Sequence, residues 1–79
     1  MTVYFENSNG TRRPLATIES EPEVYKIIHD FIAERNIAKV RAGYKPFVSY
    51  YTRSWKNEQG ETVYDVGSHS EFFILKEEE

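Results

Sequence analysis

The apolar positions between Ser20 and Asn36 recur at the spacing of one face of an α-helix. Ser20 is a favoured N-cap residue, and Glu23 follows it at the spacing of a capping box. Pro22 falls in the first turn, where its missing N–H group sacrifices no hydrogen bond. The apolar stripe consists of Val24, Ile27, Ile28, Phe31 and Ile32. These features predict one amphipathic helix over residues 20–36, with Asn36 at its C-terminal end.

The residues before this helix follow an extended pattern that one turn interrupts. Val3, Tyr4 and Phe5 are consecutive β-prone residues near the start of the chain. Residues 7–10 read Asn-Ser-Asn-Gly, which suits the positive φ angles of hairpin turns. Pro14 cannot donate to a strand ladder, so the second strand, residues 11–18, belongs at a sheet edge or contains a bulge. We expect an N-terminal β-hairpin.

Two further strands are predicted after the helix, at residues 47–56 and 61–66, joined by a turn over residues 57–60. The pairs expected for a four-residue turn are Lys56 with Glu61, Ser54 with Val63, and Thr52 with Asp65. The side chains that would then pack on the helix are Phe47, Tyr51, Trp55, Tyr64 and Val66. A three-residue turn would shift every pair by one position and mix the two faces, so we prefer the first register.

Between the helix and these strands, Ile37 and Val40 are expected beneath the helix end, followed by a loop over residues 42–46. After them, Gly67-Ser68 marks either a tight turn or a bulge in one bent strand. Residues 71–75 are apolar on both sides, which indicates a central strand or a strand whose second face a partner covers.

The last residues, 76–79, are predicted to be an acidic tail that blunts a sheet edge. The overall prediction is a single domain, residues 1–79, of the α+β class. One helix lies on one face of a four- to five-stranded antiparallel sheet, in the order ββαββ(β).

The composition is that of a small domain without disulfide bonds. The chain has 79 residues, no cysteine, six Tyr, five Phe, one Trp and a net charge of −3. Self-association would support so small a core. No apolar run approaches the about 20 residues that cross a bilayer, and the first ten residues carry no secretory signal. We therefore expect a cytoplasmic protein with no membrane partner.

Charge is distributed unevenly along the second half of the chain. Between Arg35 and Lys56 there are six basic residues and no acid, whereas seven acids and one lysine follow Lys56. The two blocks can form a binding surface, or they can face each other across a strand pair. We favour the strand pair.

Residues 65–71 gather carboxylates, a histidine and two hydroxyls near a predicted turn. A Ser-His-Asp triad needs a hydrogen-bonded nucleophile and an oriented base, whereas neighbours along a strand alternate between faces. A metal site would require His29 and His69 to converge with acids such as Asp30 or Asp65, and no recognised ligand spacing supports this. We therefore expect no catalytic residue, no metal site and no cofactor.

The leading expectation is a non-catalytic binding protein. A single helix covers one sheet face, which leaves the other face for a protein partner or a second copy of the chain. The expected outward residues are Tyr4, Val48, Tyr50 and Val63. The alternative is single-stranded nucleic-acid binding by the basic, aromatic segment 44–56. The full set of expected partner-binding residues is Tyr4, Tyr44, Val48, Tyr50, Arg53, Lys56, Val63 and His69.

The strand–turn–helix beginning and the closing segment Asp65-Val66-Gly67-Ser68-His69-Ser70-Glu71-Phe72-Phe73 resemble small uncharacterised proteins encoded by phages and prophages of Gram-positive bacteria. This resemblance covers the whole chain loosely. It implies an early or accessory phage role, including inhibition of a host or anti-phage defence protein in the host cytoplasm. It carries no diagnostic motif, so no site residue is transferred from it.

Overall fold

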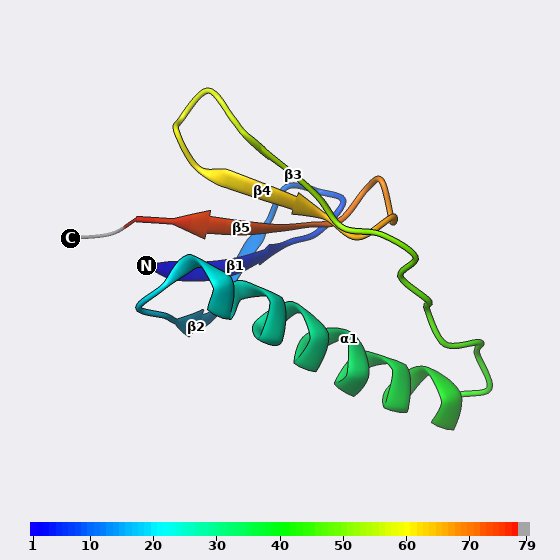
Figure 1. Cartoon of the computed structure of the whole chain (residues 1–79). Helices are drawn as coiled ribbons and strands as arrows, with labels where there is room; N and C mark the ends of the chain where they lie inside the picture. Colours follow the sequence, from blue (N-terminus) through cyan, green and yellow to red (C-terminus); the bar gives the residue numbers. More distant parts are fainter. Residues whose placement is uncertain (78–79) are drawn as a thin grey trace.

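One α-helix lies beside a five-stranded antiparallel sheet in the computed structural model, which describes residues 1–77 (Figure 1). The elements are β1 (Thr2–Glu6), β2 (Arg12–Thr17), a 3₁₀ turn (Glu21–Glu23), α1 (Val24–Arg41), β3 (Arg53–Lys56), β4 (Thr62–Asp65) and β5 (Phe72–Lys76). The strands lie in the order β2-β1-β5-β4-β3. The predicted α+β class is confirmed.

The last strand, β5, is the central strand of the sheet, as its two apolar sides predicted. Lys76 belongs to this strand, so the prediction that an edge-blunting tail begins at residue 76 is wrong. Residues 78–79 lie outside the described residues. Because β4 and β5 are separate antiparallel strands, Gly67-Ser68 lies in a connecting turn rather than in a bulge.

The helix begins with the predicted capping pattern. The Glu23 carboxylate accepts hydrogen bonds from the backbone N–H groups of Ser20 at 2.7 Å and Glu19 at 3.0 Å, and from the Ser20 hydroxyl at 3.1 Å. These bonds hold the pKa of Glu23 below its ordinary value, the Ser20 amide having the largest effect. The 3₁₀ turn contains Pro22, and α-helical geometry starts at Val24. The predicted start is confirmed.

The helix ends at Arg41, five residues beyond its predicted end. The N–H of Gly43 donates to the carbonyl of Val40 at 3.1 Å. The N–H of Tyr44 donates to the carbonyl of Lys39 at 2.8 Å. This pair of bonds is a Schellman motif, and Gly43 permits it because its φ of +86° lies in the left-handed region.

Two expectations for the last turns of α1 are therefore wrong. Asn36 does not cap the helix, because its side chain exchanges two hydrogen bonds with the backbone of Phe47. Ile37 and Val40 are 55% and 57% exposed instead of buried beneath the helix end. Figure 1 shows the reason: α1 extends past the sheet, so its last turns have no strand to cover them.

The main core lies between α1 and one face of the sheet. Val24 and Ile28 of the predicted stripe are buried there, and the rest of the stripe is partly buried against them. The buried residues that the strands and the end of β4 contribute are Val3, Tyr64, Val66, Phe73 and Leu75. The Tyr64 hydroxyl donates to the Glu21 carboxylate at 3.2 Å, which ties the sheet to the start of the helix.

The predicted N-terminal hairpin is formed by β1 and β2. β2 is an edge strand, and its pairing with β1 shifts between Val3 and Tyr4. Val3 faces Ala16, whereas Tyr4 faces Pro14, so one residue of β2 is bulged between them. Both positions allowed for a strand proline, an edge and a bulge, are therefore confirmed.

The register of β3 and β4 differs by one residue from the preferred prediction. The observed pairs are Arg53 with Asp65, Ser54 with Tyr64, Trp55 with Val63, and Lys56 with Thr62. The turn closes at Asn57, whose N–H donates to the carbonyl of Glu61 at 2.9 Å. The Asn57 side-chain oxygen accepts the N–H groups of Gln59 and Glu61 at 3.1 and 2.9 Å. This local turn chemistry sets the three-residue turn and hence the register.

The shift changes which side chains share a face. Trp55 lies on the sheet face away from the helix, where its ring meets that of Phe72 edge-on with centroids 5.9 Å apart. Only residues 53–56 of the predicted strand 47–56 pair with β4, and the preceding residues follow an irregular path. Of the side chains expected to pack on the helix, Phe47, Tyr64 and Val66 do lie in or against the core. The expectation is wrong for Tyr51 and Trp55, which are 43% and 41% exposed.

The centre of the sheet face away from the helix is buried, whereas Trp55 on its β3 edge is 41% exposed. Val63 and Ile74 on this face are only 7% and 1% exposed. The β1–β2 hairpin folds behind β4 and β5 (Figure 1), and Arg12 binds Glu6 at 3.0 Å and both oxygens of Glu61 at 2.8 and 3.0 Å. The strand register places Val63 and Ile74 between Glu6 and Glu61 on the sheet. Because Arg12 binds both acids, its side chain crosses the sheet face at Val63 and Ile74. The expectation that Val63 is exposed to a partner is wrong.

Glu61 makes this bridge sensitive to acid. Hydrogen bonds from Arg12 and then Asn57 lower the pKa of Glu61 from 4.5 to about 2, against the opposing effect of burial. Because folding lowers this pKa, the stabilisation is complete above about pH 4.5 and is lost as the pH falls towards about 2. We expect Glu61→Gln to reduce the free energy of unfolding at neutral pH by about 1–2 kcal/mol.

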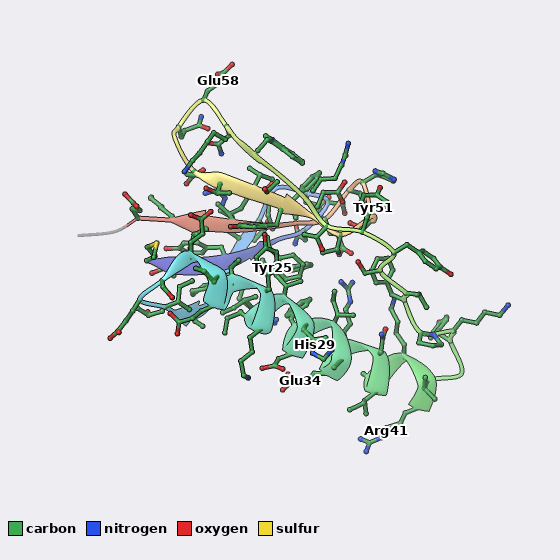
Figure 2. The ribbon with its side chains drawn as sticks, viewed as in Figure 1. Tyr25, His29, Glu34, Arg41, Tyr51 and Glu58 are labelled. Carbon is green, nitrogen blue, oxygen red and sulfur yellow. The ribbon has the colours of Figure 1, made fainter. Side chains whose placement is uncertain are left out.

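Urea denaturation at a series of pH values measures this effect. The Glu61→Gln variant should lose less stability than the wild type between about pH 4.5 and 2. Glu58→Gln is the matched control, because Glu58 projects from the tip of the β3–β4 turn (Figure 2). Parallel pH profiles for the wild type and Glu61→Gln would contradict the role of the bridge.

Candidate binding site

The last turns of α1 and the loop that returns from them project beyond the sheet (Figure 1). We call residues 37–52 the arm. Five large apolar side chains of the arm, which we call the arm residues, are each more than half exposed. They are Ile37 (55%), Val40 (57%), Tyr44 (71%), Val48 (56%) and Tyr50 (88%). Among residues 1–77, Tyr25 is the one other large apolar residue above half exposure, at 54%.

Side-chain hydrogen bonds hold the loop of the arm in place. The Asn36 amide donates to the carbonyl of Phe47 at 2.9 Å, and its oxygen accepts the Phe47 N–H at 2.8 Å. The Ser49 hydroxyl lies 3.0 Å from the backbone oxygens of both Tyr51 and Val66. The loop is therefore attached to the helix at one point and to the end of β4 at another.

The arm carries three basic residues, Lys39, Arg41 and Lys45. Arg41 and Lys45 form no ion pair among residues 1–77. Arg41 projects from the free end of α1, far from Glu58 on the β3–β4 turn (Figure 2). No acid occurs anywhere between Arg35 and Lys56. An acidic surface is the complementary partner for such a projection.

The strand-pair interpretation of the two charge blocks is only partly correct. Arg53 pairs with Asp65 across β3 and β4, with Nη2 and Oδ2 2.8 Å apart. The expected pair between Lys56 and Glu61 is wrong, because Glu61 binds Arg12. Pairing across the strands thus neutralises one cation of the basic block and leaves those of the arm.

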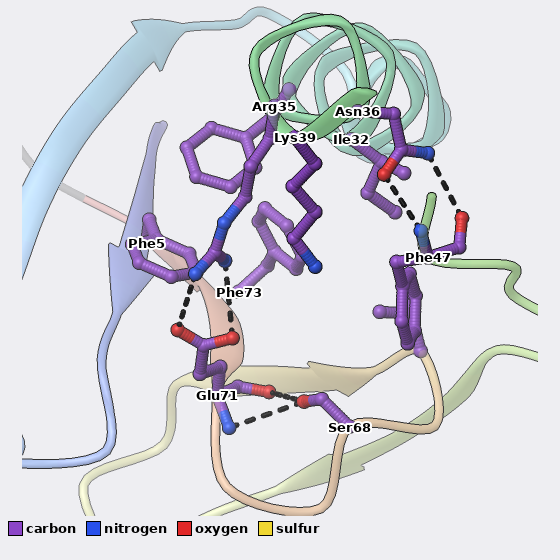
Figure 3. Close-up of a pocket in the computed structure, with 11 residues that line it drawn as sticks. Phe5, Ile32, Arg35, Asn36, Lys39, Phe47, Ser68, Glu71 and Phe73 are labelled. Atoms are coloured by element: carbon purple, nitrogen blue, oxygen red, sulfur yellow. Dashed lines mark hydrogen bonds and ion pairs between the residues drawn. The ribbon is translucent and has the colours of Figure 1, made fainter. Parts of the chain in front are cut away.

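A small pocket lies at the root of the arm, between α1 and the β4–β5 connection (Figure 3). Its volume is about 50 Å³. Its aromatic walls are Phe5, Phe31, Phe47 and Phe73. Arg35 binds both carboxylate oxygens of Glu71 at 3.1 Å. Lys39 extends into the pocket, with its nitrogen 5.9 Å from the centroid of the Phe47 ring.

Asp65 is fully buried and organises the β4–β5 connection. It accepts hydrogen bonds from Arg53 at 2.8 Å and from the N–H groups of Gly67 at 2.9 Å and His69 at 3.4 Å. Burial alone would raise the pKa of Asp65, but these bonds outweigh burial and lower it. The His69 ring lies 3.5 Å from Asp65 through Nδ1 and 3.3 Å from the Tyr51 hydroxyl through Nε2.

One of the two serine hydroxyls in residues 65–71 is engaged with the backbone. Ser68 Oγ donates to the carbonyl of Glu71 at 2.7 Å and accepts its N–H at 3.2 Å. This is the polar turn expected of serine in such a segment. His69 contacts Asp65, whereas His29 lies 3.8 Å from Asp30, so the two histidines do not converge.

The structure divides the predicted partner-binding residues into separate groups. Tyr44, Val48 and Tyr50 lie on the arm, Arg53 and His69 surround Asp65, Tyr4 and Val63 lie on the outer sheet face, and Lys56 ends β3. Val63 is buried and Tyr4 is partly buried. These two residues therefore do not extend the exposed surface of the arm.

Two arm residues, Ile37 and Val40, were not predicted to be exposed, although the sequence contains the signal. At about 100° per residue, the nine residues from Ile28 to Ile37 place these two side chains on opposite sides of the helix. Because the predicted helix ended at Asn36, Ile37 was not placed on the helix side opposite the buried Ile28. No local pattern in the sequence signals the aromatic pocket around Lys39, because β1, α1, β5 and the two connections α1–β3 and β4–β5 build it together.

Within residues 1–77, no helix combines the length and the apolar character that crossing a membrane requires. No group of three or more potential metal-ligating side chains gathers in the same part of the chain. Comparisons with protein-family models, with curated proteins and with solved structures found no match. The chemistry and geometry of the arm and its pocket therefore carry the functional conclusion.

Proposed function

We propose that this protein is a non-catalytic binding protein that holds an acidic protein partner through its arm. The observation that carries this proposal is the exposure of the five arm residues, each above half. Arg41 and Lys45 lie among them in the sequence and form no ion pair within residues 1–77. Apolar and aromatic side chains supply the contact area, while the cations orient a partner of opposite charge.

The anchoring of the arm supports the same function. Asn36 and Ser49 already fix the loop on the helix and the sheet. A loop that is ordered before binding loses less conformational entropy when a partner docks. The arm is therefore better suited to a defined protein contact than a free loop of the same composition would be.

Single-stranded nucleic acid is the second candidate partner. Tyr44 and Tyr50 are highly exposed, and Lys45 follows Tyr44 directly, so rings and a cation are available for bases and phosphates. Arg53 counts against this function, because its guanidinium is bound to Asp65. Fluorescence anisotropy with labelled single strands distinguishes the two: saturable binding that weakens with salt would contradict the acidic protein partner.

The resemblance to small phage and prophage proteins supplies the class of partner that we propose. It is a host protein or an anti-phage defence protein, inhibited in the host cytoplasm. The neighbouring genes test this part of the proposal. Genes for phage replication or defence evasion on both sides would support it, and a locus without phage genes would contradict it.

The double variant Ile37→Ser, Tyr50→Ser should weaken partner binding by more than about tenfold, because truncating an anchor at the centre of an interface costs about 2 kcal/mol or more. Affinity purification from the source cells, with the wild-type and variant proteins as baits, measures this loss. Both side chains are exposed, so the variant should retain the fold, which circular dichroism checks.

Tyr25→Ser is the matched control, because Tyr25 is similarly exposed but lies on the first half of α1. It should retain the partner. Equal recovery by the wild type and the double variant would overturn the proposal. Sedimentation equilibrium tests whether the arm instead binds a second copy of the chain. Concentration-dependent dimerisation that the double variant abolishes would show this.

A further inference from the structure

We propose that the pocket at the root of the arm binds the C-terminal residue of a partner chain, with a small branched side chain inside and the carboxylate on Lys39. This inference deepens the proposed function, on which it rests, by naming the chemical group that the arm recognises. It is carried by an ammonium group that points into an aromatic pocket whose lining carboxylate, that of Glu71, is already bound by Arg35 (Figure 3).

Lys39 is the recognition element. Among residues 1–77 it forms no ion pair, and its nitrogen faces the Phe47 ring at 5.9 Å. Glu71 is the carboxylate that lines the same pocket, and Arg35 already binds both of its oxygens. Lys39 is partly buried as a residue, and an incoming carboxylate would give its ammonium a charge-assisted hydrogen bond beside the Phe47 ring.

The walls of the pocket are preformed. The Phe5 and Phe31 rings are stacked with centroids 4.6 Å apart, and Phe31 meets Phe73 edge-on at 5.4 Å. The hydrogen bonds from Asn36 hold Phe47 on the remaining side. The rings therefore support one another, and a ligand would not have to open the pocket.

The size of the pocket selects the ligand. Its volume of about 50 Å³ is a third of the roughly 150 Å³ cavity that accepts benzene. An isopropyl group of valine size fits, whereas a phenyl ring does not. A chain end is favoured over an internal segment, because it brings a carboxylate next to the side chain without burying a second peptide group among phenyl rings.

N-acetyl-L-valine is the probe, titrated into the full-length chain while the backbone amides are followed by two-dimensional NMR. We expect saturable shifts at Phe47, Ser68 and Glu71. N-acetyl-L-valinamide, which lacks the carboxylate, should bind at least about tenfold more weakly. N-acetyl-L-phenylalanine should also bind more weakly, because its ring exceeds the pocket.

Lys39→Gln should weaken N-acetyl-L-valine at least about tenfold. Lys45→Gln removes the same charge outside the pocket, so it should change the affinity less than twofold, a limit set by the small effect of screened surface charges. An internal acidic peptide, acetyl-Val-Glu-amide, should bind as weakly as N-acetyl-L-valinamide. The amide dispersion of each variant shows that it is folded.

Three results would overturn the inference: no saturable shift, equal affinity for the acid and the amide, or equal effects of the two lysine variants. Tighter binding of acetyl-Val-Glu-amide than of N-acetyl-L-valine would overturn the assignment to a chain end. Each result is distinguishable from failure of the proposed function. The Ile37→Ser, Tyr50→Ser variant tests the arm without altering any pocket residue.

Discussion

Replacing Ile74 with alanine is expected to lower the free energy of unfolding by about 3 kcal/mol, within the range for truncating a buried isoleucine. Ile74 is 1% exposed although it lies on the sheet face away from the helix. It is flanked by Val63 on β4 and Tyr4 on β1, and Arg12 spans this face to reach Glu61. Removing its side chain would leave a cavity that these neighbours cannot fill.

Urea denaturation followed by tryptophan fluorescence measures the effect of Ile74→Ala, since Trp55 lies on the same face. Val48→Ala is the matched aliphatic control. Val48 is 56% exposed on the arm, so its truncation should change stability by less than about 0.5 kcal/mol. A loss below about 1 kcal/mol for Ile74→Ala would show that this face of the sheet is not packed.

Replacing Asp65 with asparagine is expected to reduce the free energy of unfolding by about 2–3 kcal/mol, because a buried charged acceptor of several hydrogen bonds is lost. Asp65 is 0% exposed and accepts the N–H groups of Gly67 and His69 as well as the Arg53 guanidinium. The neutral amide keeps the shape of the carboxylate but presents only one acceptor atom. The β4–β5 connection would lose the carboxylate that holds its backbone N–H groups in place.

The matched variant is Arg53→Gln, which removes the ion pair and keeps the buried carboxylate. The Arg53 side chain is 58% exposed, and solvent screens its charge, so this variant should cost below about 1 kcal/mol. Thermal unfolding of both variants at neutral pH measures the difference. Equal losses would show that the ion pair, rather than the backbone donors, accounts for the effect of Asp65.

The hairpin turns show how much register information local sequence holds. Asn7-Ser8-Asn9-Gly10 and Asn57-Glu58-Gln59-Gly60 share the pattern Asn-x-x-Gly. In both, the asparagine side chain accepts two backbone N–H groups, and the glycine adopts a positive φ. The β3–β4 register could thus have been predicted from this pattern. The prediction instead rested on segregating polar and apolar faces, which fails where the central strands bury residues on both faces of the sheet.

The end of the helix shows a competition between two local signals. Asn36 and Gly43 are both acceptable C-terminal residues, and periodicity alone does not choose between them. The helix ends near Gly43 rather than at Asn36, because the Asn36 side chain forms both of its hydrogen bonds with the backbone of Phe47. Asn36 is thus committed to a contact eleven residues away, and the helix continues.

The sequence by itself determined the α+β class, the start of the helix, the N-terminal hairpin and the restriction of the strand with Pro14 to an edge or a bulge. Each follows from neighbours within a few residues, through capping, turn chemistry and periodicity. Only the tertiary structure decided the strand order, the burial of Val63, the free projection of the arm and the pocket around Lys39. These depend on pairing β1 with β5 and on folding Arg12 across to Glu61. Contacts between such distant residues produce no periodic pattern in the sequence, because the side chains come together only when the sheet has formed.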